Sequence, residues 1–137
     1  MTRFVLDCSV TMGWCFEDEG DRYSDAVLAA LSSDRAIMPS LWSLEVANVL
    51  VASERRGRLT HEDGQRFLEL LRGLPITVSP FAPEAAEVQA LARAHRLSAY
   101  DAAYLSLALR MRLPIATRDR ALRTAARVTR VMSFRPA

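Results

Sequence analysis

The chain has 137 residues, of which half are hydrophobic and a quarter are charged, and this is the composition of one globular domain spanning residues 1–137. No apolar stretch approaches the roughly 20 residues that a bilayer requires, and the apolar run among the first ten residues is too short for a signal peptide. Two cysteines and two histidines, none in the spacing of zinc ligands, argue against a zinc site and favour a reducing, cytoplasmic compartment.

The net charge of +2 conceals a difference between the two halves of the chain. Residues 93–137 contain ten arginines and two acids, whereas residues 1–60 contain six arginines and nine acids. A basic second half is the pattern expected of a protein that binds a polyanion such as RNA. Solvated helix faces explain the same charges equally well, so the charge pattern alone leaves both interpretations open.

Short apolar runs alternate along the chain with longer segments of helical period, which predicts an α/β fold with a parallel sheet. The predicted strands are residues 3–6, 36–38, 76–78, 114–116 and 128–132. The predicted helices are residues 10–16, 21–33, 41–56, 60–73, 83–95, 98–112 and 119–126. We expect Gly57 to end the third of these helices, and Thr60 and Ser98 to cap the N-termini of two others.

Three carboxylates stand alone in apolar surroundings. Asp7 is the one charged residue between positions 4 and 16, Glu45 between 36 and 53, and Asp101 between 97 and 109. Burying an unpaired carboxylate costs on the order of several kcal/mol. No arginine lies within one helical turn of Glu45 or Asp101 to offset this cost. We therefore expect another partner for these side chains.

Two acids follow predicted strands, and the carboxyl ends of parallel strands are where such sheets bind ligands. Asp7 ends the first strand, and Asp119 comes three residues after the fourth. If these strands are neighbours, both acids open onto one crevice, which Glu45 and Asp101 can reach from flanking helices. Carboxylates at close range repel each other, and a hard cation removes this conflict. We expect Mg²⁺ or Mn²⁺, with Asp7 and Asp101 as ligands and Glu45 and Asp119 binding directly or through water.

Such a set of oxygen ligands suits metal-assisted hydrolysis of a phosphodiester bond. The candidate catalytic residues are Asp7, Glu45, Asp101 and Asp119. Ser9 and Thr117, each two residues from an acid, are candidates for positioning water or the scissile phosphate, although local hydrogen bonding explains them as well. Asn48, one turn after Glu45, is a candidate for orienting that side chain.

Most of these acids also have a structural explanation. Asp101 lies three residues after Ser98, so the pair can form a capping box at the start of a helix. Asp119 can cap the last helix, and Asp7 can accept from the N–H groups of the helix that follows it. Glu45 has no such explanation, because a glutamate in the middle of an apolar helix has no capping role.

Several segments resemble the PIN domain, and in particular the VapC-type toxins of toxin–antitoxin pairs. They are FVLDCSV, PSLWSLEVANVL, LSAYDAAYLSLALRMRLPIATRDRAL and the final short strand, so the resemblance covers essentially the whole chain. Asp7 matches the first acid of the family, Glu45 the helix glutamate, Asp101 the acid of the YDA motif, and Asp119 the acid of the T-x-D motif. Arg118 stands where relatives often carry an apolar residue.

The resemblance implies a three-layer, PIN-like sandwich in which a five-stranded parallel sheet lies between about seven helices. It also implies an endoribonuclease that depends on Mg²⁺ or Mn²⁺, forms homodimers and is inhibited by a small cognate antitoxin. Trp14 and Phe16 follow the first-strand loop closely, and they can seat an amphipathic antitoxin segment or simply fill the core.

Other classes of enzyme fit less well. A phosphoaspartyl enzyme also places an acid after the first strand, but it needs a lysine, and all 18 basic residues here are arginine. The absence of lysine also excludes a Walker A nucleotide site, and no GxGxxG motif occurs. The alternative to a nuclease is a catalytically silent PIN-like domain that binds RNA or protein, because the fold does not by itself determine the function.

Overall fold

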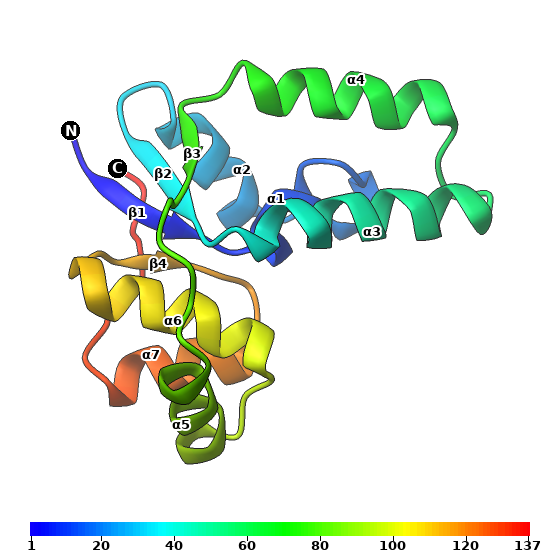
Figure 1. The fold of residues 1–137 in the computed structure, drawn as a ribbon. Helices are drawn as coiled ribbons and strands as arrows, with labels where there is room; N and C mark the ends of the chain where they lie inside the picture. The colour runs from blue at the N-terminus through cyan, green and yellow to red at the C-terminus, as the bar shows by residue number, and fades with distance from the viewer.

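A parallel sheet of four strands forms the centre of the computed structural model, which describes residues 1–137 (Figure 1). The strands are β1 (Arg3–Leu6), β2 (Arg35–Met38), β3 (Ile76–Val78) and β4 (Ile115–Ala116), and their order in the sheet is β3-β2-β1-β4. Strands β1 and β4 pair in parallel through Val5 with Ile115 and Leu6 with Ala116. The first and fourth strands are therefore neighbours, as the predicted crevice requires.

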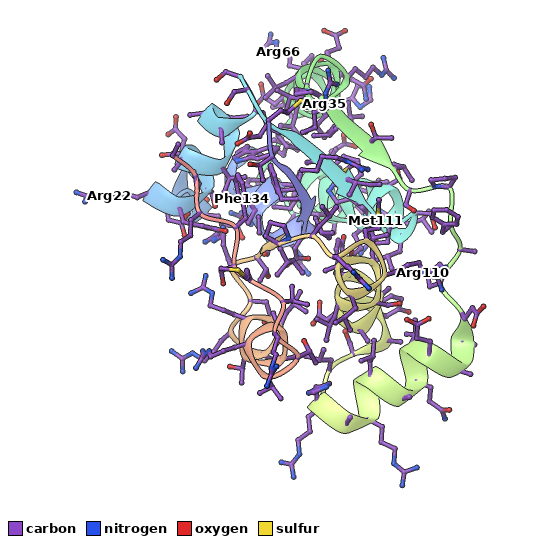
Figure 2. The ribbon with its side chains drawn as sticks, turned by 90° about the vertical axis from the view of Figure 1, so that its left-hand side faces the viewer. Arg22, Arg35, Arg66, Arg110, Met111 and Phe134 are labelled. Atoms are coloured by element: carbon purple, nitrogen blue, oxygen red, sulfur yellow. The ribbon has the colours of Figure 1, made fainter.

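Seven α-helices surround the sheet, as the sequence predicts. They are α1 (Cys8–Gly13), α2 (Arg22–Ala30), α3 (Leu41–Arg55), α4 (His61–Arg72), α5 (Ala85–His95), α6 (Ala99–Met111) and α7 (Arg120–Val128), with a short 3-10 turn η1 (Glu17–Glu19) after α1. Helices α5, α6 and α7 form one group on one side of the sheet, and α1 to α4 lie on the other (Figures 1 and 2). No helix has both the length and the apolar composition that crossing a bilayer demands.

The predicted fifth strand at residues 128–132 is wrong. Helix α7 continues through Val128, and the chain then turns at Arg130, which has a φ of 65°. Beyond this turn the chain lies along β4, where Ile115 N–H donates to Met132 O at 2.9 Å and Phe134 N–H donates to Ile115 O at 2.8 Å. These bonds form a single bridge, because β4 is two residues long and offers no further ladder partner.

Some helix boundaries also differ from the prediction. Helix α1 begins at Cys8 and ends at Gly13, whereas the sequence pattern placed it at residues 10–16. Phe16 lies outside the helix in an extended conformation with φ −113° and ψ 122°. The expected N-caps are present, since Thr60 and Ser98 accept the N–H groups of Asp63 and Asp101, both at 3.1 Å.

The core surrounds β1, whose residues Phe4, Val5 and Leu6 are fully buried. Helix α6 packs directly on β1 and is buried along most of its length, from Ala102 to Ala108. The ring of Phe134 stacks on Phe4 with 3.8 Å between centroids, so the C-terminal segment closes the core at the β4 edge. Together these contacts hold β1 between α6 and the C-terminal segment.

Candidate active site

Asp7, directly after β1, is the most buried of the four candidate acids, with 4 % of its surface exposed. Its Oδ2 accepts two hydrogen bonds, from the Thr117 hydroxyl at 2.6 Å and from the Ser9 hydroxyl at 2.7 Å. Burial raises the pKa of the Asp7 carboxyl, and these two hydrogen bonds partly oppose that shift. Asp7 stands at the N-cap position of α1, but its side chain forms no capping hydrogen bond to that helix.

The two hydroxyl groups on Asp7 connect the ends of β1 and β4. Ser9 Oγ accepts the Arg118 N–H at 2.9 Å, and Thr117 Oγ1 accepts the Asp119 N–H at 3.0 Å. Each hydroxyl donates to Asp7 while it accepts from the loop after β4. In this arrangement Ser9 and Thr117 position the Asp7 carboxylate, and their single protons are already used.

Glu45 lies on α3 and is held by a residue of α6. The Tyr104 hydroxyl donates to Glu45 Oε1 at 2.6 Å, and the tyrosine side chain is fully buried. Burial raises the pKa of Glu45 in the first place, and the negative charges of Asp7 and Asp101 raise it further, whereas the bond from Tyr104 lowers it. Glu45 therefore interacts electrostatically with both aspartates.

Asp101 is half-buried in the first turn of α6. Burial, followed by the charges of Asp7 and Asp119, raises the pKa of Asp101 to about 6. Its backbone N–H donates to the Ser98 hydroxyl at 3.1 Å, which is one half of a capping box. The reciprocal bond from the Ser98 N–H to the Asp101 carboxylate does not form, so the capping box is incomplete.

Asp119 has a structural role at the start of α7. Its Oδ2 accepts the Leu122 N–H at 3.0 Å, which makes Asp119 the N-cap of the helix. Its charge nevertheless reaches the site, because it contributes to raising the pKa values of Asp7 and Asp101. A capping carboxylate with a second, uncommitted oxygen can serve both roles.

No arginine forms an ion pair with any of the four acids. Arg118, which adjoins Asp119 in sequence, pairs instead with Asp21 at 3.2 Å and donates to the Ser9 carbonyl at 3.3 Å. Arg123 donates to the Thr117 carbonyl at 2.9 Å. The nearby guanidinium groups therefore leave the negative charge of the carboxylates uncompensated.

The chemistry of these ligands fits a hard divalent cation. All available donors are oxygens, and the carboxyl groups of Asp7, Glu45 and Asp101 have raised pKa values, which a bound cation would lower again. No three acidic, histidine or cysteine side chains converge closely enough to hold an ion among themselves. Mg²⁺ typically binds through one or two carboxylates, waters and substrate phosphates, so it does not require such a cage.

Sequence reasoning missed Tyr104 and chose Asn48 in its place. Asn48 is exposed and makes no hydrogen bond to Glu45. A signal for Tyr104 was present, because it lies three residues after Asp101 in YDAAYLSLA and so on the same face of the helix. Tyr104 is the one residue that bonds the Glu45 side chain.

Trp14 and Phe16 are part of the core. Phe16 is buried beneath the guanidinium of Arg58, which lies 4.5 Å from the ring centroid. Trp14 is partly buried, and its indole N–H donates to the Ser24 carbonyl at 2.8 Å, which ties α1 to α2. These residues are therefore not the exposed apolar seat for a partner that their sequence position suggested.

Comparison with known proteins identifies the family and supports the fold. The PIN-domain family matches residues 4–128. Among solved structures, the crystal structure of PAE2754 from Pyrobaculum aerophilum is similar, with a TM-score of 0.70 and 23% sequence identity over 90% of this chain and 84% of that chain. At this identity the likeness concerns the fold alone. No curated protein sequence matches the chain significantly.

The chain therefore belongs to the PIN-domain family. Its members are typically nucleases that act on nucleic acid and generally use divalent metal ions. The resemblance read from the sequence motifs is thus confirmed for the PIN domain. Membership of the VapC-type toxins stays a prediction.

Proposed function

We propose that this protein is an endoribonuclease that depends on Mg²⁺ or Mn²⁺ and acts as the toxin of a VapC-type toxin–antitoxin pair. The observation that supports the nuclease is the grouping of Asp7, Glu45, Asp101 and Asp119 at the carboxyl edge of β1 and β4, with no basic partner. Both cysteines carry free thiols, which suits a cytoplasmic protein.

In this proposal the side chains divide the work. Asp7 and Asp101 hold the cation, and Glu45 and Asp119 bind it directly or through water. When bound, the cation neutralises phosphate charge and activates water for attack on phosphorus. Ser9 and Thr117 hold Asp7 in place through its Oδ2. Tyr104 holds Oε1 of Glu45 and so leaves Oε2 to accept a proton from water.

Exposed apolar surface on α3 supports the proposed partners. Leu44 and Val51 of this helix are 75 % and 45 % exposed, as an apolar contact in a homodimer requires. A cavity of about 260 Å³ between α3 and α4 is lined by Trp42, Val46 and Leu71, among others. We propose that it receives apolar side chains of the antitoxin, in place of the partly buried Trp14 and the buried Phe16.

Cleavage of RNA by the purified protein tests the nuclease. Wild-type protein should cut single-stranded RNA with Mg²⁺ or Mn²⁺ and should stop in excess EDTA. Asp7→Asn should abolish cleavage and weaken metal binding in calorimetry, whereas Glu62→Gln, an exposed change on α4, should do neither. Equal cleavage in EDTA would refute the metal mechanism. A folded protein that binds RNA but never cuts it would favour the alternative, a catalytically silent binding domain.

Co-expression with the product of the adjacent reading frame tests the toxin. That product should co-purify with this chain and suppress its RNase activity. Trp42→Ala changes a residue that lines the α3–α4 cavity. A folded variant should therefore bind the partner less tightly while it still cleaves RNA. An adjacent product that neither binds nor inhibits would refute the toxin and leave the nuclease standing.

A further inference from the structure

A second cavity lies at the opposite edge of the sheet from the four acids. It has a volume of about 600 Å³, within the range of roughly 300–1,000 Å³ that is typical of ligand sites. Thr2, Asp34 and Pro114, which line it, directly precede or lie next to the starts of β1, β2 and β4. Figure 2 views this edge, with Met111 at the end of α6 and Phe134 in the C-terminal segment. The cavity is therefore separate from the catalytic edge.

The charged groups of this cavity are predominantly basic. Three arginines line it, namely Arg112, Arg130 and Arg135, and none of them forms an ion pair with a carboxylate. Asp34 is the one acidic side chain in the lining, and its Oδ1 accepts the Thr2 N–H at 2.8 Å. The cavity thus combines unpaired guanidinium groups with a net positive charge, which suits a phosphate.

The backbone at two of these arginines is unusual. Arg112 ends α6 with φ 55° and Arg130 follows α7 with φ 65°, both in the left-handed region where glycine is the preferred residue. A side chain at such a position carries a backbone cost that glycine avoids. A cation also suits a helix C-terminus, and Arg96 at the end of α5, with φ 55°, shares that environment outside the cavity.

The remaining wall of the cavity is apolar. Leu109, Leu113 and Val131 contribute to it, together with Phe134. An inorganic anion would use the arginines alone and would leave this surface without a partner. A nucleotide uses both parts, because its phosphate binds guanidinium groups while its base or sugar packs on apolar and planar groups.

We propose that this cavity is a second nucleotide-binding site, which takes one phosphate-bearing nucleotide of a single-stranded RNA outside the cleaved bond. The proposal rests on RNA being the substrate, as inferred above. The site lies at the amino edge of the sheet, so it lengthens the contact with RNA without taking part in the chemistry. It assigns a function to three of the ten arginines in the basic second half of the chain, namely Arg112, Arg130 and Arg135.

RNA binding without cleavage tests this proposal. A fluorescent ten-nucleotide single-stranded RNA is titrated in EDTA, with fluorescence anisotropy as the readout at several salt concentrations. Arg112→Gly with Arg130→Gly should weaken binding about 10-fold and reduce the slope of log K against log salt by about 0.7, the value for one phosphate contact on a single strand. Glycine fits both backbone conformations, so the melting temperature should hold or rise. Arg96→Gly, the matched change outside the cavity, should leave binding and slope unchanged.

A second measurement locates the ligand. Adenosine 5′-monophosphate, added to the wild-type protein, should shift backbone NMR signals in residues 108–114 and 130–135, and these shifts should vanish in the double glycine variant. Unchanged RNA affinity in that variant, or shifts confined to other regions, would overturn the proposal. Cleavage is assayed separately with Mg²⁺ or Mn²⁺. If the wild-type protein never cleaves RNA but the double glycine variant still loses RNA affinity, the second site stands and the proposed nuclease activity fails.

Discussion

The hydroxyl of Tyr104 donates a hydrogen bond to Glu45 Oε1 at 2.6 Å and so joins the two helices that carry acids of the candidate site. Tyr104 is on α6, the same helix as Asp101, whereas Glu45 is on α3. Because α6 packs on β1, whose end carries Asp7, one helix determines the placement of Asp101 directly and of Glu45 through Tyr104. A residue that contacts no substrate can therefore control the geometry of the catalytic edge.

Tyr104→Phe should lower RNase activity about 10-fold, because Glu45 loses the bond that positions it. Since that bond lowers the pKa of Glu45, its removal should raise the pKa further, and activity should fall off at a higher pH on the acidic side of the pH–rate profile. The stability loss should be about 1 kcal/mol, typical of one buried hydrogen bond. Tyr100→Phe, an exposed change on the same helix, is the matched control. A variant with an unchanged profile but a lower Tm would show that Tyr104 has a purely structural role.

The acids should differ in their importance for cleavage. Asp7→Asn, Glu45→Gln and Asp101→Asn should each lower kcat/KM by about 10²-fold or more, because metal placement fails without the full ligand set. Glu62→Gln is a suitable control. Glu87 is unsuitable, because its carboxylate accepts from the buried Ser106 hydroxyl at 2.8 Å and pairs with Arg110 at 3.2 Å. Full activity in any of the three acid variants would remove that residue from the site.

Asp119 offers a way to separate structure from catalysis. Asn is as good an N-cap as Asp, so Asp119→Asn should keep the stability of α7 and lose less activity than the other three changes. Asp119→Ala removes the bond to the Leu122 N–H and should lose about 1 kcal/mol as well. Thermal melts and single-turnover cleavage of the two variants measure these effects. Equal Tm values for the Asn and Ala variants would contradict the capping role.

The elements that the sequence predicted well are those with strong local signals. Helix α6 begins after the Ser98 cap and consists of a long, mostly apolar run. The strands β1 to β3 are short apolar segments between turn residues. The segment at 128–132 carries the same apolar signal, but its pairing depends on β4, which is too short to extend the ladder. Pairing between distant segments is not encoded locally, so the fifth strand was predicted where the structure has one bridge.

The four acids could be predicted because each is a charge in surroundings that favour burial. Their supporting residues carry no such signal. Tyr104 fits an apolar helix as well as a leucine does, and only the packing of α6 against α3 directs its hydroxyl to Glu45. Asn48, chosen for its spacing from Glu45, faces solvent, because spacing along one helix does not show which face the rest of the protein covers. Side-chain partners from different elements require the fold.

In the absence of metal, the protein should be more stable at pH 5 than at pH 7. Burial and neighbouring charges raise the pKa of Asp101 in the folded state to about 6, against an ordinary value of 3.8. A carboxyl group with a raised pKa in the folded state stabilises the fold fully below its unfolded pKa. That contribution is lost as the pH rises through the folded value. For Asp101 the loss therefore falls between about pH 4 and pH 6, and Asp7 and Glu45, whose pKa values are also raised, add to it in the same direction.

Thermal melts in EDTA at pH 5, 6 and 7, with Asp101→Asn beside the wild type, measure this effect. Asp101 is half-exposed, so solvent screening reduces its share to about 1 kcal/mol, or about 3 °C in Tm. Asp101→Asn should reduce the fall in Tm between pH 5 and pH 7 by that amount, and the variant should melt higher than the wild type at pH 7. Glu62→Gln should keep the wild-type dependence of Tm on pH. Mg²⁺ added at pH 7 should raise the Tm of the wild type more than that of the variant, because binding stabilises the folded state. A variant that melts lower at pH 7 would show that the Asp101 carboxylate mainly stabilises the start of α6.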